Sequence, residues 1–176
     1  MEQRPRPSCP PSQAGFTLIE LVIVITIIGI LAAVAMPRLI DAQRDARIAK
    51  ANAIYGSIRS AVVLARSRCE LDLAGTTPSA TTSNCASTPP VVNMDGYSVT
   101  IVNKHPAATA QGVDQAAQLN LTSDGLTATN TGTGTPTRTY DVNGGTAPNC
   151  RISYQEATLS GAVITSPVIT VTTTGC

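Results

Sequence analysis

The sequence predicts an α+β protein in which a long N-terminal helix packs against an antiparallel β-sheet. Three observations lead to this prediction. The run from Phe16 to Met36 is nearly all apolar and contains one charge, apolar residues then recur at helical spacing as far as Cys69, and short β-rich segments fill the remainder. The chain divides into a leader (1–15), an apolar helix (16–37), its amphipathic continuation (38–73) and a β-sheet head domain (74–176).

The first element is an apolar helix with a single charge. The residues from Phe16 to Met36, rising about 1.5 Å each, cover the roughly 30 Å hydrocarbon core of a bilayer. The segment therefore predicts a membrane-spanning helix. Glu20 lies inside this run, where an ionisable side chain is costly and usually functional. That residue requires a specific role.

The second element is an amphipathic continuation of the same helix. Its predicted buried face has three- and four-residue spacing: Ala51, Ile54, Ile58, Ala61, Val62, Ala65 and Cys69. Asn52, Arg59 and Arg66 lie on the opposite face. Gly29 and Pro37 interrupt the helical pattern, since glycine weakens a helix and proline removes a backbone donor. A kink or a locally unwound stretch is expected there.

The head domain begins with a polar loop at residues 74–90, and strands follow. Alternation and β-branched composition predict strands at 97–102, 150–154 and 167–172, and a hairpin with strands at 119–122 and 126–128. Residues 130–145 are rich in Gly and Thr and give no prediction. The resulting sheet is expected to pack on the amphipathic half of the helix.

Composition and motifs argue against several kinds of function. Lys and Arg number 12 against 11 Asp and Glu, so there is no basic footprint for nucleic acid. The only histidine, His105, is predicted to lie in a surface loop without a nucleophile. No cysteine pair has zinc-ligand spacing, and no phosphate-binding or dinucleotide fingerprint is found. We therefore expect no enzyme activity, cofactor or metal.

The segment Gly15-Phe-Thr-Leu-Ile-Glu-Leu21, with its apolar continuation and Pro37, resembles the N-terminal signature of type IV pilins and pseudopilins. The resemblance implies the pilin fold, cleavage by a prepilin peptidase between Gly15 and Phe16, and methylation of the new Phe16 amine. The leader departs from the common pattern, because Ser12-Gln-Ala14 precedes the cleavage site in place of a basic residue. The C-terminal stretches 149–157 and 167–176 further resemble pilins of the mannose-sensitive haemagglutinin (MSHA) type.

The resemblance also gives Glu20 a role, which is to pair with the Phe16 amine of a neighbouring subunit in a filament. The alternative is that the carboxylate caps its own helix N-terminus. For Gly29 to Pro37 the resemblance implies a helix segment that extends on packing.

Five cysteines are present, and Cys9 lies in the leader. The other four allow three connectivities. We predict Cys69–Cys85 and Cys150–Cys176, because each pair closes a contiguous loop and the second would hold the last strand.

Three functional hypotheses follow. The first is a structural subunit of a type IV pilus, a homo-oligomeric filament for adhesion or motility. Such a subunit is held in the bacterial inner membrane with its N-terminus cytoplasmic, assembled there by the pilus machinery and then displayed on the cell surface. The second is a pseudopilin of a type II secretion system. The third is a minor pilin or membrane-anchored adhesin that never polymerises.

Overall fold

The computed structural model describes residues 15–75 and 84–176. The leader residues 1–14, with Cys9, lie outside the described residues. The chain forms two compact units, one ending at Ala42 and one running from Gln43 to Cys176. Each unit is described by itself below.

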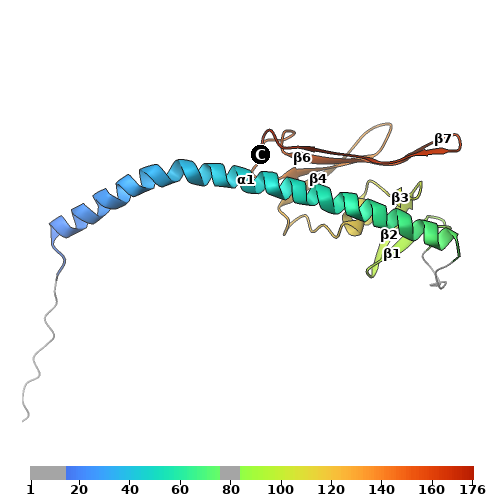
Figure 1. Cartoon of the computed structure of the whole chain (residues 1–176), viewed down its shortest axis with the longest axis horizontal. Coiled ribbons are helices and arrows are strands. Elements are labelled where there is room, and N and C mark those ends of the chain that lie inside the picture. Colours follow the sequence, from blue (N-terminus) through green and yellow to red (C-terminus); the bar gives the residue numbers. More distant parts are fainter. Residues whose placement is uncertain (1–14, 76–83) are drawn as a thin grey trace, which may run out of the picture. The chain divides into compact units, whose positions relative to one another are not determined.

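The helix α1 (Leu18–Leu73) begins in the first unit and ends in the second (Figure 1). It is long and apolar enough to cross a membrane, and its most apolar 18-residue window has a mean hydropathy of 2.9 with no buried residue. The helix passes through Gly29 and Pro37 without a break, so of the two alternatives expected there, a kink or a locally unwound stretch, the unwound stretch is wrong for this structure. A proline deprives the helix of one N–H, and the hydrogen bonds of the turns before and after it hold the segment helical.

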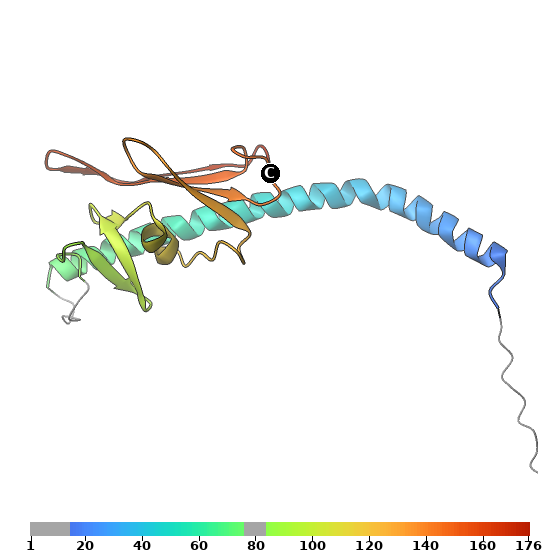
Figure 2. The same ribbon diagram turned by 180° about the vertical axis from the view of Figure 1, so that it is seen from behind.

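The buried face of α1 agrees with the prediction. The buried residues of the helix are Ala51, Ile54, Ile58, Ala61, Val62, Ala65 and Cys69, whereas Asn52, Arg59 and Arg66 are exposed. The small side chains of Ala51 and Ala65, both fully buried, let the sheets approach the helix closely. Figure 2 shows the strands of the second unit lying along this part of the helix.

The main sheet has four antiparallel strands in the order β4-β5-β6-β9. They are β4 (Leu126–Thr131), β5 (Thr137–Val142), β6 (Arg151–Gln155) and β9 (Val168–Thr172). Tyr140, Ile152 and Tyr154 are fully buried and form a core with Ile54 and Ile58 of the helix. Alternate residues of β5 and β6 therefore face α1, and the predicted α+β architecture is confirmed.

The predicted hairpin with strands at 119–122 and 126–128 is wrong. Residues 119–122 form no strand, and β4 pairs instead with β5, which lies in the Gly- and Thr-rich stretch for which no structure was predicted. Asp124 accepts a hydrogen bond from the backbone N–H of Asn120, and the Asn120 side chain accepts one from that of Ser123. These side-chain bonds to the backbone favour a turn over an extended strand.

A second, three-stranded sheet has the order β1-β2-β3. It comprises β1 (Val91–Met94), β2 (Tyr97–Val102) and β3 (His105–Pro106), and it is followed by a π-helical turn, η1 (Ala110–Asp114). Val92, Val99 and Ile101 pack with Ala65 and Cys69 of α1 in a separate core cluster. A two-stranded hairpin, β7 (Thr158–Ser160) and β8 (Val163–Thr165), forms a third sheet. The elements β1, β3, η1, β7 and β8 are too short for a periodic pattern in the sequence to predict them.

His105 lies on β3 and is 3% exposed, so the prediction of a surface position is wrong. Its Nδ1 lies 2.8 Å from the carbonyl oxygen of Asn103. Burial lowers the pKa of the imidazole; the hydrogen bond to Asn103 opposes this shift, nearby Arg66 adds to it and Glu70 opposes it.

Because the folded state binds a proton at His105 less readily than the unfolded chain does, the free energy of unfolding should be highest above pH 6.5, the ordinary pKa of histidine. It should fall as the pH drops below that value, by at most about 1.4 kcal/mol per pH unit from this group. Urea unfolding between pH 5 and 8 measures the effect. His105→Asn, which does not titrate, should remove this component of the pH dependence. An unchanged slope in that variant would assign it to other groups.

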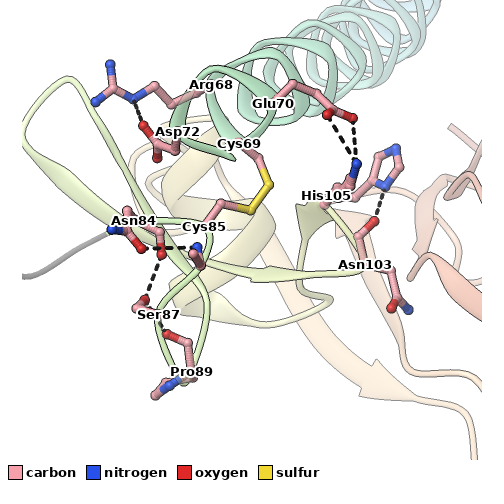
Figure 3. The surroundings of a disulfide bond; sticks show 12 residues. Arg68, Cys69, Glu70, Asp72, Asn84, Cys85, Ser87, Pro89, Asn103 and His105 are labelled. Carbon is pink, nitrogen blue, oxygen red and sulfur yellow. Dashed lines mark hydrogen bonds and ion pairs between the residues drawn. A yellow bond between two sulfur atoms is a disulfide. The ribbon is translucent and has the colours of Figure 1, made fainter. Parts of the chain in front are cut away.

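Two disulfides close loops in the second unit. Cys69 of α1 joins Cys85 with a Cα–Cα distance of 5.1 Å, and Cys150 joins Cys176 at 4.8 Å. Figure 3 shows the first bridge, which joins the C-terminal part of α1 to the segment before β1. The second ties the chain terminus, beside β9, to the start of β6.

Loop-closure entropy predicts that the bridge with the larger sequence separation, 26 residues against 16, stabilises more. Replacing Cys150 and Cys176 by alanine should lower the free energy of unfolding by about 3.5 kcal/mol, and replacing Cys69 and Cys85 by about 3 kcal/mol. Denaturant titrations of the full chain in detergent measure both values. Mass spectrometry of a non-reduced digest tests the pairing, and a peptide joining Cys69 to Cys150 would contradict it.

Candidate processing and assembly site

The N-terminus of α1 carries a reciprocal capping arrangement. Thr17 precedes the first helical residue, and its backbone N–H and its hydroxyl donate to the Glu20 carboxylate at 2.9 and 2.8 Å. The Glu20 backbone N–H in turn lies 3.3 Å from the Thr17 Oγ1, which accepts its hydrogen bond. This is a Thr-x-x-Glu capping box, which satisfies two otherwise unpaired donors at the helix start. In the single chain, therefore, Glu20 caps its own helix.

The same carboxylate remains available to a partner. Glu20 is fully exposed, and both of its printed hydrogen bonds fall on Oε2. A carboxylate has about four lone-pair sites on two oxygens. A cation from outside can consequently bind Oε1 without displacing Thr17.

The backbone just before the helix is open. Gly15 and Phe16 precede the helix, and nothing lies within 4 Å of the place where a side chain at Gly15 would stand. Phe16 is 92% exposed. An exposed non-helical peptide bond between these two residues is chemically accessible to a protease, and its cleavage would leave an amine one helical turn from Glu20.

Between Glu20 and Met36, the first unit presents a largely apolar surface. Exposed large apolar side chains follow one another along α1, among them Ile23, Ile27, Ile30, Leu31 and Val34. Monomeric soluble proteins rarely expose contiguous apolar patches of this kind. The helix therefore requires an apolar surrounding, either lipid or other helices.

The second unit contains a buried polar cluster that was not predicted from the sequence. Arg138 of β5 makes an ion pair with Asp114 of η1 at 2.5 Å, and the Tyr140 hydroxyl also donates to Asp114. Asn130 accepts a further hydrogen bond from Arg138 at 2.8 Å. Burial raises the pKa of Tyr140 strongly, and the charge and hydrogen bond of Asp114 raise it further. The hydrogen bonds from Arg138 to Asp114 raise the pKa of Arg138. The cluster joins η1 to the sheet and has no exposed reactive group.

In the part of the chain that the structure describes, no group of three His, Cys, Asp or Glu side chains is placed to hold a metal ion.

Comparison with known families places residues 10–36 in the family of the prokaryotic N-terminal methylation motif. This match covers the capping box, the exposed Gly15–Phe16 bond and the apolar helix. The N-terminal segment thus matches an N-terminal methylation motif.

Individual pilus and fimbrial proteins are also similar to this chain, each over about 50 residues. The chain is 53% identical over 51 residues to the type IV narrow pilus major component PilA5 of Thermus thermophilus, covering 29% of this chain and 44% of that protein. It is 54% identical over 50 residues to the fimbrial protein EcpB of Eikenella corrodens, covering 28% and 31%. It is 52% identical over 50 residues to the type IV major pilin protein PilE1 of Neisseria gonorrhoeae, covering 28% and 30%.

These matches span less than half the length of the relatives. No solved structure matches the chain. The fold of the head domain is therefore known from this structure and not from a solved relative, and its resemblance to MSHA-type pilins stays a prediction.

Proposed function

We propose that this chain is a structural subunit of a type IV pilus, which polymerises through its N-terminal helix into an extracellular filament for adhesion or motility. The observation that carries the proposal is an exposed apolar helix that has a single carboxylate in its first turn and whose N-terminal part lies within a methylation motif. Before assembly the helix is held in the inner membrane, with the leader on the cytoplasmic side. After assembly it lies among other copies of itself.

Processing is the first step of the proposed mechanism. A prepilin peptidase removes the leader by cutting between Gly15 and Phe16, and the Phe16 amine is methylated. Glycine at the cut offers a flexible backbone without a side chain. A methylated amine remains a cation, so it keeps its attraction for a carboxylate.

Assembly is the second step. The Glu20 carboxylate of a subunit joining the filament pairs with the Phe16 amine of a neighbour, because two opposite charges in an apolar surrounding each compensate the other's lost hydration. The pair fixes the axial position of the new subunit. Gly29 and Pro37 weaken the helix locally and give the packed segment its extensibility. The segments 16–37 and 38–73 then serve as filament core and head support, and 74–176 forms the outer domain.

Deletion of the chain tests this proposal against the alternatives. We expect loss of surface filaments in electron micrographs and unchanged amounts of secreted proteins. Lost secretion with unchanged filaments would instead assign the chain to a type II pseudopilus. Filaments that persist and contain only another pilin would make it a minor subunit or adhesin.

The mature chain gives a second test. Mass spectrometry of the purified filament subunit should find Phe16 as the first residue, carrying one methyl group. An N-terminus upstream of Gly15 in assembled filaments would contradict the processing step.

A further inference from the structure

The hairpin of β7 and β8 is an uncharged ribbon without a supporting layer. From Ala157 to Cys176 the sequence has no Asp, Glu, Lys or Arg side chain. The two strands form a sheet of their own, and Figure 2 shows this hairpin projecting beyond the four-stranded sheet. A two-stranded hairpin is marginally stable in water, and natural proteins usually protect exposed strand edges with charges. This ribbon lacks that protection.

Apolar side chains stand on both faces of the ribbon. Leu159 is directly opposite Ile164, and Val163 is opposite Ser160, so the strand register places Leu159 and Val163 on opposite faces. Leu159 is 56% exposed and Val163 is 69% exposed. A ribbon that lay flat on a surface would bury one of these side chains and leave the other in water. Insertion into a groove buries both.

The second unit has a groove of suitable size and character. It has a volume of about 850 Å³ and lies between α1 and the segment that leads into β9. Val62, Val63 and Leu71 line it from the helix, and Pro167 and Ile169 line it from the sheet. This volume is within the range of sites that enclose several apolar groups, roughly 300–1,000 Å³.

Two of the polar side chains that line the groove suit a strand edge. Arg59 and Arg66 line it, and within residues 15–75 and 84–176 neither makes a hydrogen bond or an ion pair. Their guanidinium groups are donors only, and a neutral ribbon with an unpaired edge offers backbone carbonyl acceptors. The ribbon and the groove are therefore complementary in apolar character and in hydrogen bonding.

We propose that the β7–β8 hairpin of one copy inserts into the α1–β9 groove of the next copy in the filament. This inference rests on the proposed function. The ribbon and the groove are different surfaces of one chain, so their contact is heterologous, and each copy uses one of each. Such a contact repeats without closing on itself when the rotation between copies does not complete a ring. It would join head domains, in addition to the contacts of the apolar helices.

Photo-crosslinking in assembled filaments tests the contact. A photoreactive amino acid replaces Val163 in the full chain, which is co-expressed with the unmodified chain so that filaments grow. We expect a crosslinked dimer on denaturing gels, with the crosslink mapped by mass spectrometry to residues 55–74. The same probe at Thr133, which is exposed in the loop between β4 and β5, should give no crosslink to that segment.

Two neighbouring helix residues provide matched variants. Val63 and Leu64 are 60% and 61% exposed, and only Val63 lines the groove. Val63→Asp should reduce the crosslinked dimer at least about tenfold, which corresponds to about 1.4 kcal/mol of contact energy. Leu64→Asp should leave it unchanged.

The outcomes separate the two proposals. Filaments with no dimer, a dimer mapped to another segment, or a link within one chain would each overturn the hairpin contact and leave the pilus function intact. Absence of filaments from cells with the unmodified chain would overturn the proposed function and this contact with it.

Discussion

Replacing Glu20 by glutamine should strongly reduce filament growth while leaving the start of α1 intact. Glutamine still accepts the hydrogen bonds of Thr17, since a capping box tolerates Glu or Gln at this position. It carries no charge, so it cannot compensate a Phe16 amine in an apolar filament core. We expect at least about tenfold fewer filaments, with normal membrane insertion and cleavage.

This variant separates the two roles of the carboxylate. The structure shows Glu20 capping its own helix, and the proposed filament uses the same group between subunits. Glu20→Ala removes both roles, Glu20→Gln removes only the charge, and Thr17→Val removes the capping hydroxyl and keeps the charge. We therefore expect Glu20→Gln to resemble Glu20→Ala, and Thr17→Val to resemble the unchanged chain.

Filament counts by electron microscopy, with the mass of the membrane-bound subunit as a control for cleavage, measure the result. Normal filaments from Glu20→Gln would show that capping is the only role of the side chain. The intersubunit pair would then be wrong, and the stagger between subunits would have to come from other contacts.

The sequence predicted the helix and its buried face accurately for a physical reason. A helix that packs on one side needs apolar residues every three or four positions, and the sequence shows this spacing from Ala51 to Cys69. Strand β2 (Tyr97–Val102) was predicted with its observed bounds, because β-branched and aromatic residues are concentrated there. Local patterns sufficed for these elements.

The partner of β4 could not be predicted in this way. Asp124-Gly125 lies next to Leu126 and favours a local hairpin, yet β4 pairs with β5 across a longer loop. The pairing depends on Tyr140 of β5, which packs on α1, and on the anchoring of its neighbour Arg138 to η1. These contacts join segments distant in sequence, and a Gly- and Thr-rich stretch gives no periodic sign of them.

Asp114 is the residue at which this long-range organisation should be most vulnerable. Its carboxylate receives hydrogen bonds from Arg138 and Tyr140, and its side chain and that of Arg138 are only 7% and 10% exposed. Asp114→Ala would leave the guanidinium buried without its counter-charge. Removing one partner of a buried pair costs about 3–5 kcal/mol. We expect a loss of this size in the free energy of unfolding of the full chain.

A second ion pair in the same sheet provides the matched control. Arg151 and Asp141 also join through two hydrogen bonds, at 2.6 and 2.8 Å, but their side chains are 30% and 20% exposed. Water can solvate either partner there, so Asp141→Ala should cost only about 0–1 kcal/mol. Denaturant unfolding of both variants compares the pairs directly. Equal losses would show that burial does not set the strength of the Asp114 cluster. If instead replacing Asp114 and Arg138 together by leucine and methionine restores the stability, the large single-residue loss arises from the unpaired charge.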